Sequence, residues 1–368
     1  GHKGRRAEVG YRFDQYDKSD YYVATGLDVR DYSNVQHTVR ALYSTAPLPL
    51  WAEGHTLELT GGGDLARDYL LTYQFRGDAH RQFTADGYVQ ADFHLGAQWE
   101  AVATARYDYF SVGHHGRPTT KLTARYRNGA WTLRASYGQG FRAPTLKEKY
   151  MNFFLNDIFI IRGHEQLRPE VSHNWHVSAD WSKGGTEVSS SVSYNRVLDR
   201  ITTAEPTTER DGLSGLPFVD YINVPRLTVW NAQLCVNHRR RLGSGTLSGT
   251  FQYAFTHEQA PTVGTLTPYM PARPHSATAR LAYDRRFSPQ YAVGVQLSGR
   301  FLSALSGREY NSATGASRTL HYPAYALLRL ALTQQMGTAV RLNLTHFPSI
   351  LPFHHPPLSK STYLCSHH

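Results

Sequence analysis

The sequence lacks any long apolar run and has few sulfur-containing residues. No segment approaches the eighteen or so consecutive apolar residues of a membrane-spanning helix, and the mean hydropathy is −0.47. A helical membrane protein is therefore excluded. A membrane barrel is not, because half of each strand faces a polar interior and lowers the mean hydropathy. The two cysteines, Cys235 and Cys365, provide no disulfide framework.

Acidic residues are also scarce relative to basic ones. The formal net charge is +10, with 39 Lys and Arg against 29 Asp and Glu. The basic residues are dispersed over alternate positions and turns, and the one tight run is at 239–241. This distribution favours a polar interior and solvated turns over nucleic-acid binding, although it also favours attraction of anionic ligands. The chain starts without an apolar leader, so we expect an export signal to be absent or removed.

Aromatic residues are abundant and alternate with polar ones, which is typical of strands. The chain has 24 Tyr and 16 Phe. The apolar faces of 99–109 and 291–301 each begin and end on aromatic residues and span ten positions, or roughly 33 Å of strand. With a tilt of about 40–45°, each projects to roughly 24 Å, the height of the apolar band of an outer-membrane barrel. The spacing predicts two aromatic girdles.

Short turns and long polar connections alternate along the chain. Tight turns are expected near 128–129, 183–185, 242–244, 287–289 and 336–337, and long connections at 111–118, 141–168, 202–216, 257–272 and 304–322. The strands between and before them are expected at 5–14, 36–46, 55–66, 81–95, 98–110, 119–127, 131–139, 169–182, 186–201, 217–239, 246–256, 273–285, 291–303, 323–334 and 338–345. The predicted class is an all-β, antiparallel transmembrane barrel with short periplasmic turns and long extracellular loops.

One segment resembles a known family of outer-membrane proteins. Residues 137–170 read YGQGFRAPTLKEKYMNFFLNDIFIIRGHEQLRPE, and their Arg-Ala-Pro corner and Leu-Arg-Pro-Glu ending resemble the FRAP and NPNLKPE elements of TonB-dependent receptors. Four other segments resemble strands of the same family: 87–91, 191–202, 221–224 and 271–277. The order and spacing of these segments make the resemblance specific.

The resemblance implies a particular part of such a receptor. Family barrels have about 22 strands around a plugged lumen, so residues 1–345 would supply about fifteen of them, without the plug or the last strand. Residues 346–368 form an atypical Pro- and His-rich tail, which suggests an altered reading frame. The implied location is the bacterial outer membrane. The implied partners are the TonB complex, acting through a plug absent from this chain, and outer-membrane lipid and lipopolysaccharide, with no nucleic acid.

The resemblance implies transport of a ferric siderophore for iron uptake. Haem or cobalamin are the alternative ligands of the same family, and a non-functional truncated remnant is an alternative of a different class. A soluble β-rich binding protein is a weaker third hypothesis. The sequence shows no Ser/His/Asp arrangement or carboxylate pair, so we expect no enzyme, no catalytic residue, no resident metal and no cofactor beyond the transported ligand.

Candidate ligand-binding residues lie in two predicted extracellular loops. In 141–168, an aromatic and cationic surface for a ferric siderophore is expected from Tyr150, Phe153, Phe154 and Phe159 with Arg162, beside the corner residue Arg142. The alternative is that these side chains pack the loop on the barrel rim. In 111–118, His114 and His115 are placed to touch a ligand. Receptors for haem carry a ligand histidine between the two motifs, and His164 stands at the Asn position of the second one.

Overall fold

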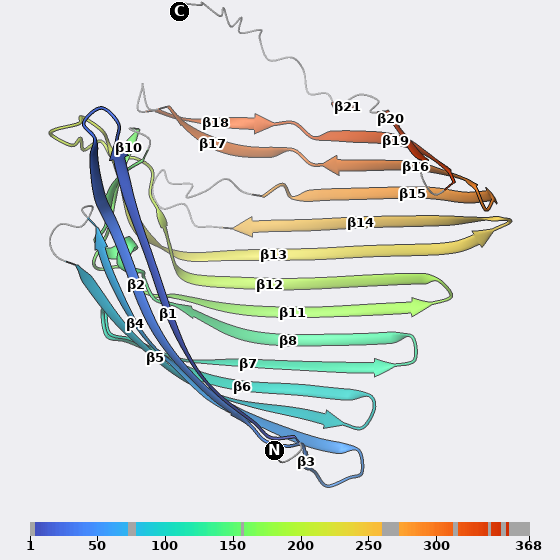
Figure 1. The fold of residues 1–368 in the computed structure, drawn as a ribbon, viewed down its shortest axis with the longest axis horizontal. Helices are drawn as coiled ribbons and strands as arrows, with labels where there is room; N and C mark the ends of the chain where they lie inside the picture. The colour runs from blue at the N-terminus through green and yellow to red at the C-terminus, as the bar shows by residue number, and fades with distance from the viewer. Residues whose placement is uncertain are drawn as a thin grey trace, which may run out of the picture.

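The chain forms one wide antiparallel sheet that curves into an open shell (Figure 1). The computed structural model describes residues 4–72, 79–155, 158–259, 272–311, 316–337, 340–346 and 351–352. Its long strands are β1 (Arg6–Tyr22), β2 (Leu27–Ser44), β4 (His55–Thr72), β5 (His80–Leu95), β6 (Trp99–Phe110), β7 (His115–Asn128), β8 (Trp131–Arg142), β11 (Glu170–Lys183), β12 (Thr186–Thr203), β13 (Phe218–Leu242), β14 (Gly245–Gln259), β15 (His275–Ser288), β16 (Tyr291–Leu302), β19 (Tyr325–Met336) and β20 (Val340–His346).

Each long strand pairs with the next one, from β1–β2 to β19–β20. Within the described residues, no pairing joins β1 to β20, so these two strands are the edges of the shell. Most connections at one end of the shell are tight, and most of those at the other end are longer (Figure 1). This up-and-down order confirms the predicted antiparallel barrel wall.

The remaining elements are short. They are β3 (Leu48–Pro49), α1 (Leu146–Tyr150), β9 (Asn152–Leu155), β10 (Phe159–Arg162), the separate hairpin of β17 (Leu305–Asn311) and β18 (Ala316–Tyr322), and β21 (Leu351–Pro352), which pairs with β19. In the described part of the chain, no helix is long and apolar enough to cross a bilayer. The rest of the predicted tail, 347–350 and 353–368, lies outside the described residues.

Most predicted strands are confirmed, and three regions differ. The first hairpin is much longer than predicted: β1 and β2 run through 15–35 to a turn at 23–26, and this part of the hairpin extends the sheet beyond the apolar band. The predicted long connection 111–118 is a four-residue turn, since β7 begins at His115. The predicted connection 304–322 contains the hairpin of β17 and β18.

The outward face of the sheet is apolar and carries two aromatic rows. Tyr137, Trp175, Tyr194 and Trp230 are direct register partners across β8, β11, β12 and β13, with neighbouring ring centroids 5.2, 5.4 and 4.6 Å apart. Nearer the short turns, Trp99 lies 4.6 Å from Tyr126, and Trp131 lies 6.4 Å from Trp181. Their many exposed apolar neighbours, such as Val177 and Leu297, suit contact with lipid.

The inward face is polar and contains a row of charges in register. Asp64, Asp86 and Asp108 are direct partners across β4, β5 and β6, and the row ends on Arg40 in β2 and Arg117 in β7. Arg106 lies between two of these carboxylates, 3.0 Å from Asp86 and 2.8 Å from Asp108. Ion pairs Arg125–Glu100 and Arg134–Asp180 continue this wall over β6 to β11. We call the three aspartates the acid row.

Candidate functional site

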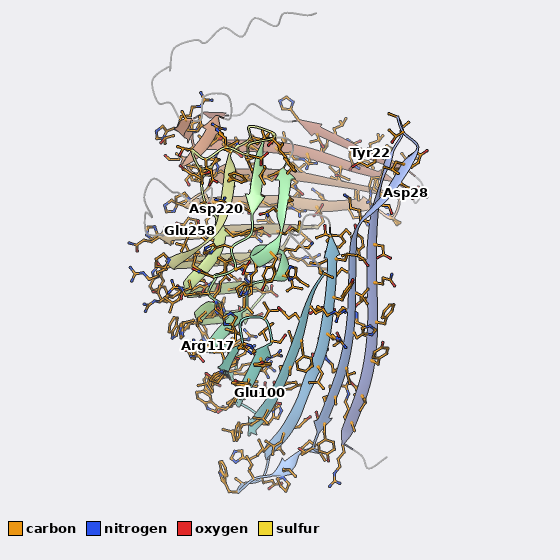
Figure 2. The ribbon with its side chains drawn as sticks, turned by 90° about the vertical axis from the view of Figure 1, so that its left-hand side faces the viewer. Tyr22, Asp28, Glu100, Arg117, Asp220 and Glu258 are labelled. Atoms are coloured by element: carbon orange, nitrogen blue, oxygen red, sulfur yellow. The ribbon has the colours of Figure 1, made fainter. Side chains whose placement is uncertain are left out.

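The connection between β8 and β11, residues 143–168, folds inward over the concave face; we call it the inward loop. Three contacts fix its position: Leu146 packs on Leu70, the Lys147 ammonium lies 4.8 Å from the Tyr32 ring centroid, and Tyr150 stacks on His80 at 4.0 Å with rings 5° apart. All three partners occupy inward positions of β2, β4 and β5, three to five strands away from β8. Figure 2 shows α1, β9 and β10 between the two arms of the shell.

Local chemistry explains why α1 forms where it does. Thr145 caps the helix: its hydroxyl accepts from the Glu148 N–H, and the Glu148 carboxylate accepts from the Thr145 N–H at 2.8 Å. Pro144 precedes the cap and cannot donate a backbone hydrogen bond of its own. The helix ends at Tyr150, since Met151 is extended with ψ 135°. The resulting turn directs the chain from the end of β8 across the open end of the shell that carries the long connections. We call this end the mouth.

Arg142 joins this helix to the next strand. Its guanidinium donates to both oxygens of Glu148 at 2.9 Å and to both oxygens of Glu170 at 2.7 and 3.0 Å. Hydrogen bonding to Glu170 raises the pKa of Arg142 above its ordinary value, despite burial. Burial opposes ionisation of Glu170, but Arg142 and the Ile201 N–H hold the pKa of that carboxyl below its usual range. The predicted ligand residue Arg142 is thus engaged by two carboxylates.

The far end of the inward loop is fixed by Asn223. Its carboxamide accepts from the Arg168 N–H at 2.8 Å and donates to the Arg168 carbonyl at 2.9 Å and the Asp199 carbonyl at 2.7 Å. Arg168 also pairs with the Asp199 carboxylate at 2.6 Å. The flanking Leu167 and Val224 are 2% and 1% exposed. We call Arg142, Glu148, Arg168, Glu170, Asp199 and Asn223 the rim anchor.

The rim anchor brings together four of the motifs that carried the family resemblance. They are the Arg-Ala-Pro corner, the Leu-Arg-Pro-Glu ending, the Asp-Arg-Ile of β12 and the Tyr-Ile-Asn-Val of β13. In the sequence they are separated by up to about eighty residues, and in the fold they meet at one place on the rim. The four motifs therefore supply the contacts that hold the inward loop at the rim.

Arg162 makes a third attachment, to β13. β10 runs parallel to β13, with Ile160 opposite Phe218. The Arg162 guanidinium donates to Asp220 at 2.6 and 3.1 Å and to Glu209 at 3.2 Å, and it lies 4.5 Å from the Phe218 ring centroid. Asp220 marks this position in Figure 2. Like Arg142, the predicted Arg162 is held by acidic neighbours.

A group of desolvated bases lies on α1 and on the strand ends beside it. Lys149 is 6% exposed, and Nε2 of His115 is buried without a hydrogen-bond partner among the described residues. Burial lowers the pKa of Lys149 and of His80, while the charge of Glu165 opposes both shifts. Burial, then the Lys149 and His114 charges, lower the pKa of His115. Burial also raises the pKa of Tyr150. Proximity to the Glu165 carboxylate partly compensates this buried positive charge.

The other predicted site residues lie at the same mouth, and most of them are exposed. Phe154 is 54% exposed and Ile158 is 40% exposed, while Phe153 is half-buried. His164 is exposed, and its N–H donates to the Glu148 carbonyl at 2.9 Å. His114 is exposed with φ 51°, and its Nδ1 lies 3.2 Å from the Tyr109 hydroxyl. Within the described residues, no group of three or more His, Cys, Asp or Glu could hold a metal ion.

The structure thus gathers all eight predicted residues at one end of the shell. Sequence reasoning missed His80, Lys149, Glu165 and Asn223. Asn223 belongs to a segment that resembles a family strand, so a signal for it existed. His80 and Lys149 belong to no motif, and Glu165 follows His164 in the second motif without any sign of its partners. Their proximity arises because the inward loop crosses from β8 to β4 and β5.

Comparison with known proteins identifies the family. A family model described as TonB dependent receptor-like, beta-barrel, matches residues 3–345. Among curated proteins, none matches this chain.

Solved structures with the same fold include receptors and a transporter. The siderophore receptor PirA from Acinetobacter baumannii is 14% identical, with TM-score 0.59 over 89% of this chain and 53% of that chain. The ferric enterobactin receptor PfeA from Pseudomonas aeruginosa is 14% identical, with TM-score 0.61 over 93% and 53%. The FrpB iron transporter from Neisseria meningitidis is 13% identical, with TM-score 0.60 over 94% and 58%.

This chain spans between half and two thirds of the length of those proteins, and identities this low show the fold alone. The match over residues 3–345, the paired strands and the apolar outward face agree on one location, the bacterial outer membrane. The chain belongs to the TonB-dependent receptor β-barrel family.

Proposed function

We propose that this chain serves the uptake of a ferric siderophore, which binds at the extracellular mouth. The observation that carries the proposal is the inward loop, held across the concave face by the rim anchor and by Arg162. A loop fixed in this way presents its exposed side chains to a ligand without a large ordering cost. The similar structures are of receptors for a siderophore and for ferric enterobactin and of an iron transporter, which supports the same class of cargo.

The exposed side chains of the loop suit a chelate with aromatic or apolar surface. Phe154 and Ile158 are exposed apolar side chains near the end of the β9–β10 hairpin, and His164 adds a polar group on the same loop. Arg142 and Arg162 act in this proposal as positioning residues, because their guanidinium groups already satisfy carboxylates. Their contribution to ligand binding is to hold the loop in place.

The chain's role in transport would be capture and guidance rather than catalysis. The loops bind the ligand, and the polar inward wall lines its path. Energy would enter from the TonB complex through a plug domain, which would lie outside residues 3–345 because these match the barrel throughout. The proposal needs no cofactor other than the iron complex that is carried.

Ligand titrations test the proposal. The chain in detergent would be titrated with a ferric catecholate, a ferric hydroxamate, haem and cyanocobalamin, with tryptophan fluorescence as the signal. We expect saturable binding of one ferric siderophore. Phe154→Ser should weaken it by about tenfold, since burial of an aromatic side chain contributes about 1.5 kcal/mol or more.

The matched control is Leu213→Ser. Leu213 is fully exposed at the tip of the neighbouring loop 204–217, whose turn is held by Asp211. This change should leave the affinity unaltered. Saturable binding of haem or cobalamin in place of a ferric siderophore would contradict the proposed cargo, and equal losses in the two variants would contradict the role of the inward loop.

A further inference from the structure

The inward face of β13 to β20 carries arginines from its middle to its short-turn end. A row of direct register partners runs from Asp180, which pairs with Arg134 on the inward wall, across β12 to β15 and ends at Arg300 on β16. Because register partners and alternate residues of a strand share a face, this row identifies the other inward arginines. They are Arg239 and Arg241 on β13, Arg280 and Arg286 on β15, Arg329 on β19 and Arg341 on β20.

These arginines, which we call the arginine ladder, occupy successive levels of the wall. Arg300 lies at the level of Thr278, and each further level is two residues along β15. The levels hold, in order toward the short turns, Arg300, then Arg280 with Arg329, then Arg239, then Arg241, and last Arg286 with Arg341. Successive levels are about 7 Å apart, since a strand rises about 3.4 Å per residue. An anion at one level therefore lies within the field of the next, because the Debye length is about 8 Å at physiological ionic strength.

The charge of the arginine ladder is not balanced by the wall that carries it. Among the described inward positions of β13 to β20 at these levels, Asp284 is the only carboxylate. All the ladder arginines are exposed, and apart from Arg329 none makes an ion pair or a side-chain hydrogen bond within the described residues. The acid row lies on β4 to β6, beyond β7, β8, β11 and β12, and it is already bound by Arg40 and Arg106. The ladder therefore presents an excess of positive charge to the lumen.

We propose that the arginine ladder is a path for an iron chelate of net negative charge, such as a tris-catecholate or a carboxylate complex. This inference rests on the proposed function and narrows its cargo to an anionic class. Guanidinium groups bind negatively charged oxygens through paired, charge-assisted hydrogen bonds. A chelate wider than one level contacts two levels at once, so a new charge contact forms at each step as an old one breaks. A neutral chelate gains nothing from the ladder, and the wall therefore favours the anionic class.

The test measures binding of radioactive iron chelates to the full chain in detergent by equilibrium dialysis, at low and at physiological salt. The probes are a trianionic ferric tris-catecholate and a neutral ferric trihydroxamate. The anionic chelate should show a salt-dependent component that the double variant R239Q/R286Q weakens about tenfold, at roughly threefold for each exposed charge contact. The neutral chelate should show no such component. The charge-retaining R239K/R286K should keep most of the affinity.

The matched control is R240Q/R285Q. Arg240 and Arg285 are sequence neighbours of ladder residues on the same two strands, but they lie on the outward face, so the control removes the same charge from the other side of the sheet. It should bind both chelates as the parent does. Equal losses in the two double variants, or an equal loss of the neutral and the anionic chelate in R239Q/R286Q, would overturn the proposal.

Failure of the ladder and failure of the proposed function give different results. If a ferric siderophore binds, is weakened by Phe154→Ser and is insensitive to R239Q/R286Q, the proposed function stands and the ladder is overturned. If neither chelate binds the chain, the proposed function fails, and the cargo class inferred from the ladder fails with it.

Discussion

At the scale of single residues, Arg142 has an unusual position, because one guanidinium serves two carboxylates from two elements. Glu148 and Glu170 are 16% and 19% exposed, so removal of the cation leaves two poorly solvated like charges facing each other. We expect Arg142→Met to destabilise the docked inward loop by about 1–3 kcal/mol, the usual cost of losing hydrogen bonds to charged groups. Hydrogen exchange of the amides in 145–170 should accelerate accordingly.

Arg168→Met is the control for that change. Arg168 pairs with Asp199, but its side chain is 65% exposed, and such surface pairs contribute little. The same amides should exchange nearly as in the parent. Exchange that accelerated equally in both variants would show that the rim depends on positive charge in general and not on the bridging geometry of Arg142.

The desolvated bases on α1 and beside it predict a pH response of the loop. Burial lowers the pKa of His80 and His115 when the loop is docked. Between those lowered values and the ordinary one near 6.5, the two histidines therefore bind more protons in the undocked state than in the docked state. Docking should therefore be strongest above about pH 6.5 and weaken as the pH falls through that window. Hydrogen exchange of 145–155, corrected for intrinsic rates, measures this, and H80Q/H115Q should abolish the response.

At the scale of elements, Asn223 connects strand β13 to the end of the inward loop and to β12. Replacement by Ala removes three hydrogen bonds and leaves both backbone groups of Arg168 unpaired. We expect a cost of about 2–3 kcal/mol to the local structure. Limited proteolysis should cut the variant within 163–170 faster than the parent, whereas Asn237→Ala, which lies on the same strand near the short turns, should not change that rate.

The elements also show what the sequence could predict. Alternation located nearly all the strands, because one buried face imposes a period of two. It missed much of the first hairpin, since residues 15–35 lie beyond the apolar band and neither of their faces is uniformly apolar. It predicted 304–322 as a connection for the same reason. In strand segments that lie outside the bilayer, neither face has to be apolar. The alternation of apolar and polar residues that identifies a strand is therefore absent there.

The sequence predicted which residues lie at the mouth, but not which contacts they make. The loop location followed from the strand order, so Tyr150, Phe154 and His164 were expected at the end of the shell that carries the long connections, and they lie there in the structure. The stack of Tyr150 on His80 joins residues seventy positions apart, and no local spacing encodes it. Arg142 and Arg162 looked like free cations because Glu170 and Asp220 lie on later strands, and because the sequence does not show that α1 turns Glu148 back toward Arg142.

At the scale of the whole molecule, the tryptophans report on the lipid contact. Five of the six lie on the outward face, at 99, 131, 175, 181 and 230, and Trp51 lies in the turn before β4. In proteoliposomes, brominated acyl chains should quench most of the emission, more strongly with bromine near the headgroup than at the chain end. Trp51→Phe should leave the quenched fraction nearly unchanged, and weak quenching would contradict the assigned lipid face.

The rim anchor has a consequence for the order of folding. Arg168 and Asn223 are 55 residues apart, and Arg142 and Glu170 are 28 apart, so these contacts require β8, β11, β12 and β13 to be paired first. Closing such long segments is slow because chain entropy is lost before the contacts form. The mouth should therefore be the last region to become ordered during assembly. Until then the aromatic residues of the loop are open to chaperones and proteases, so the rate of this late step sets the period of exposure.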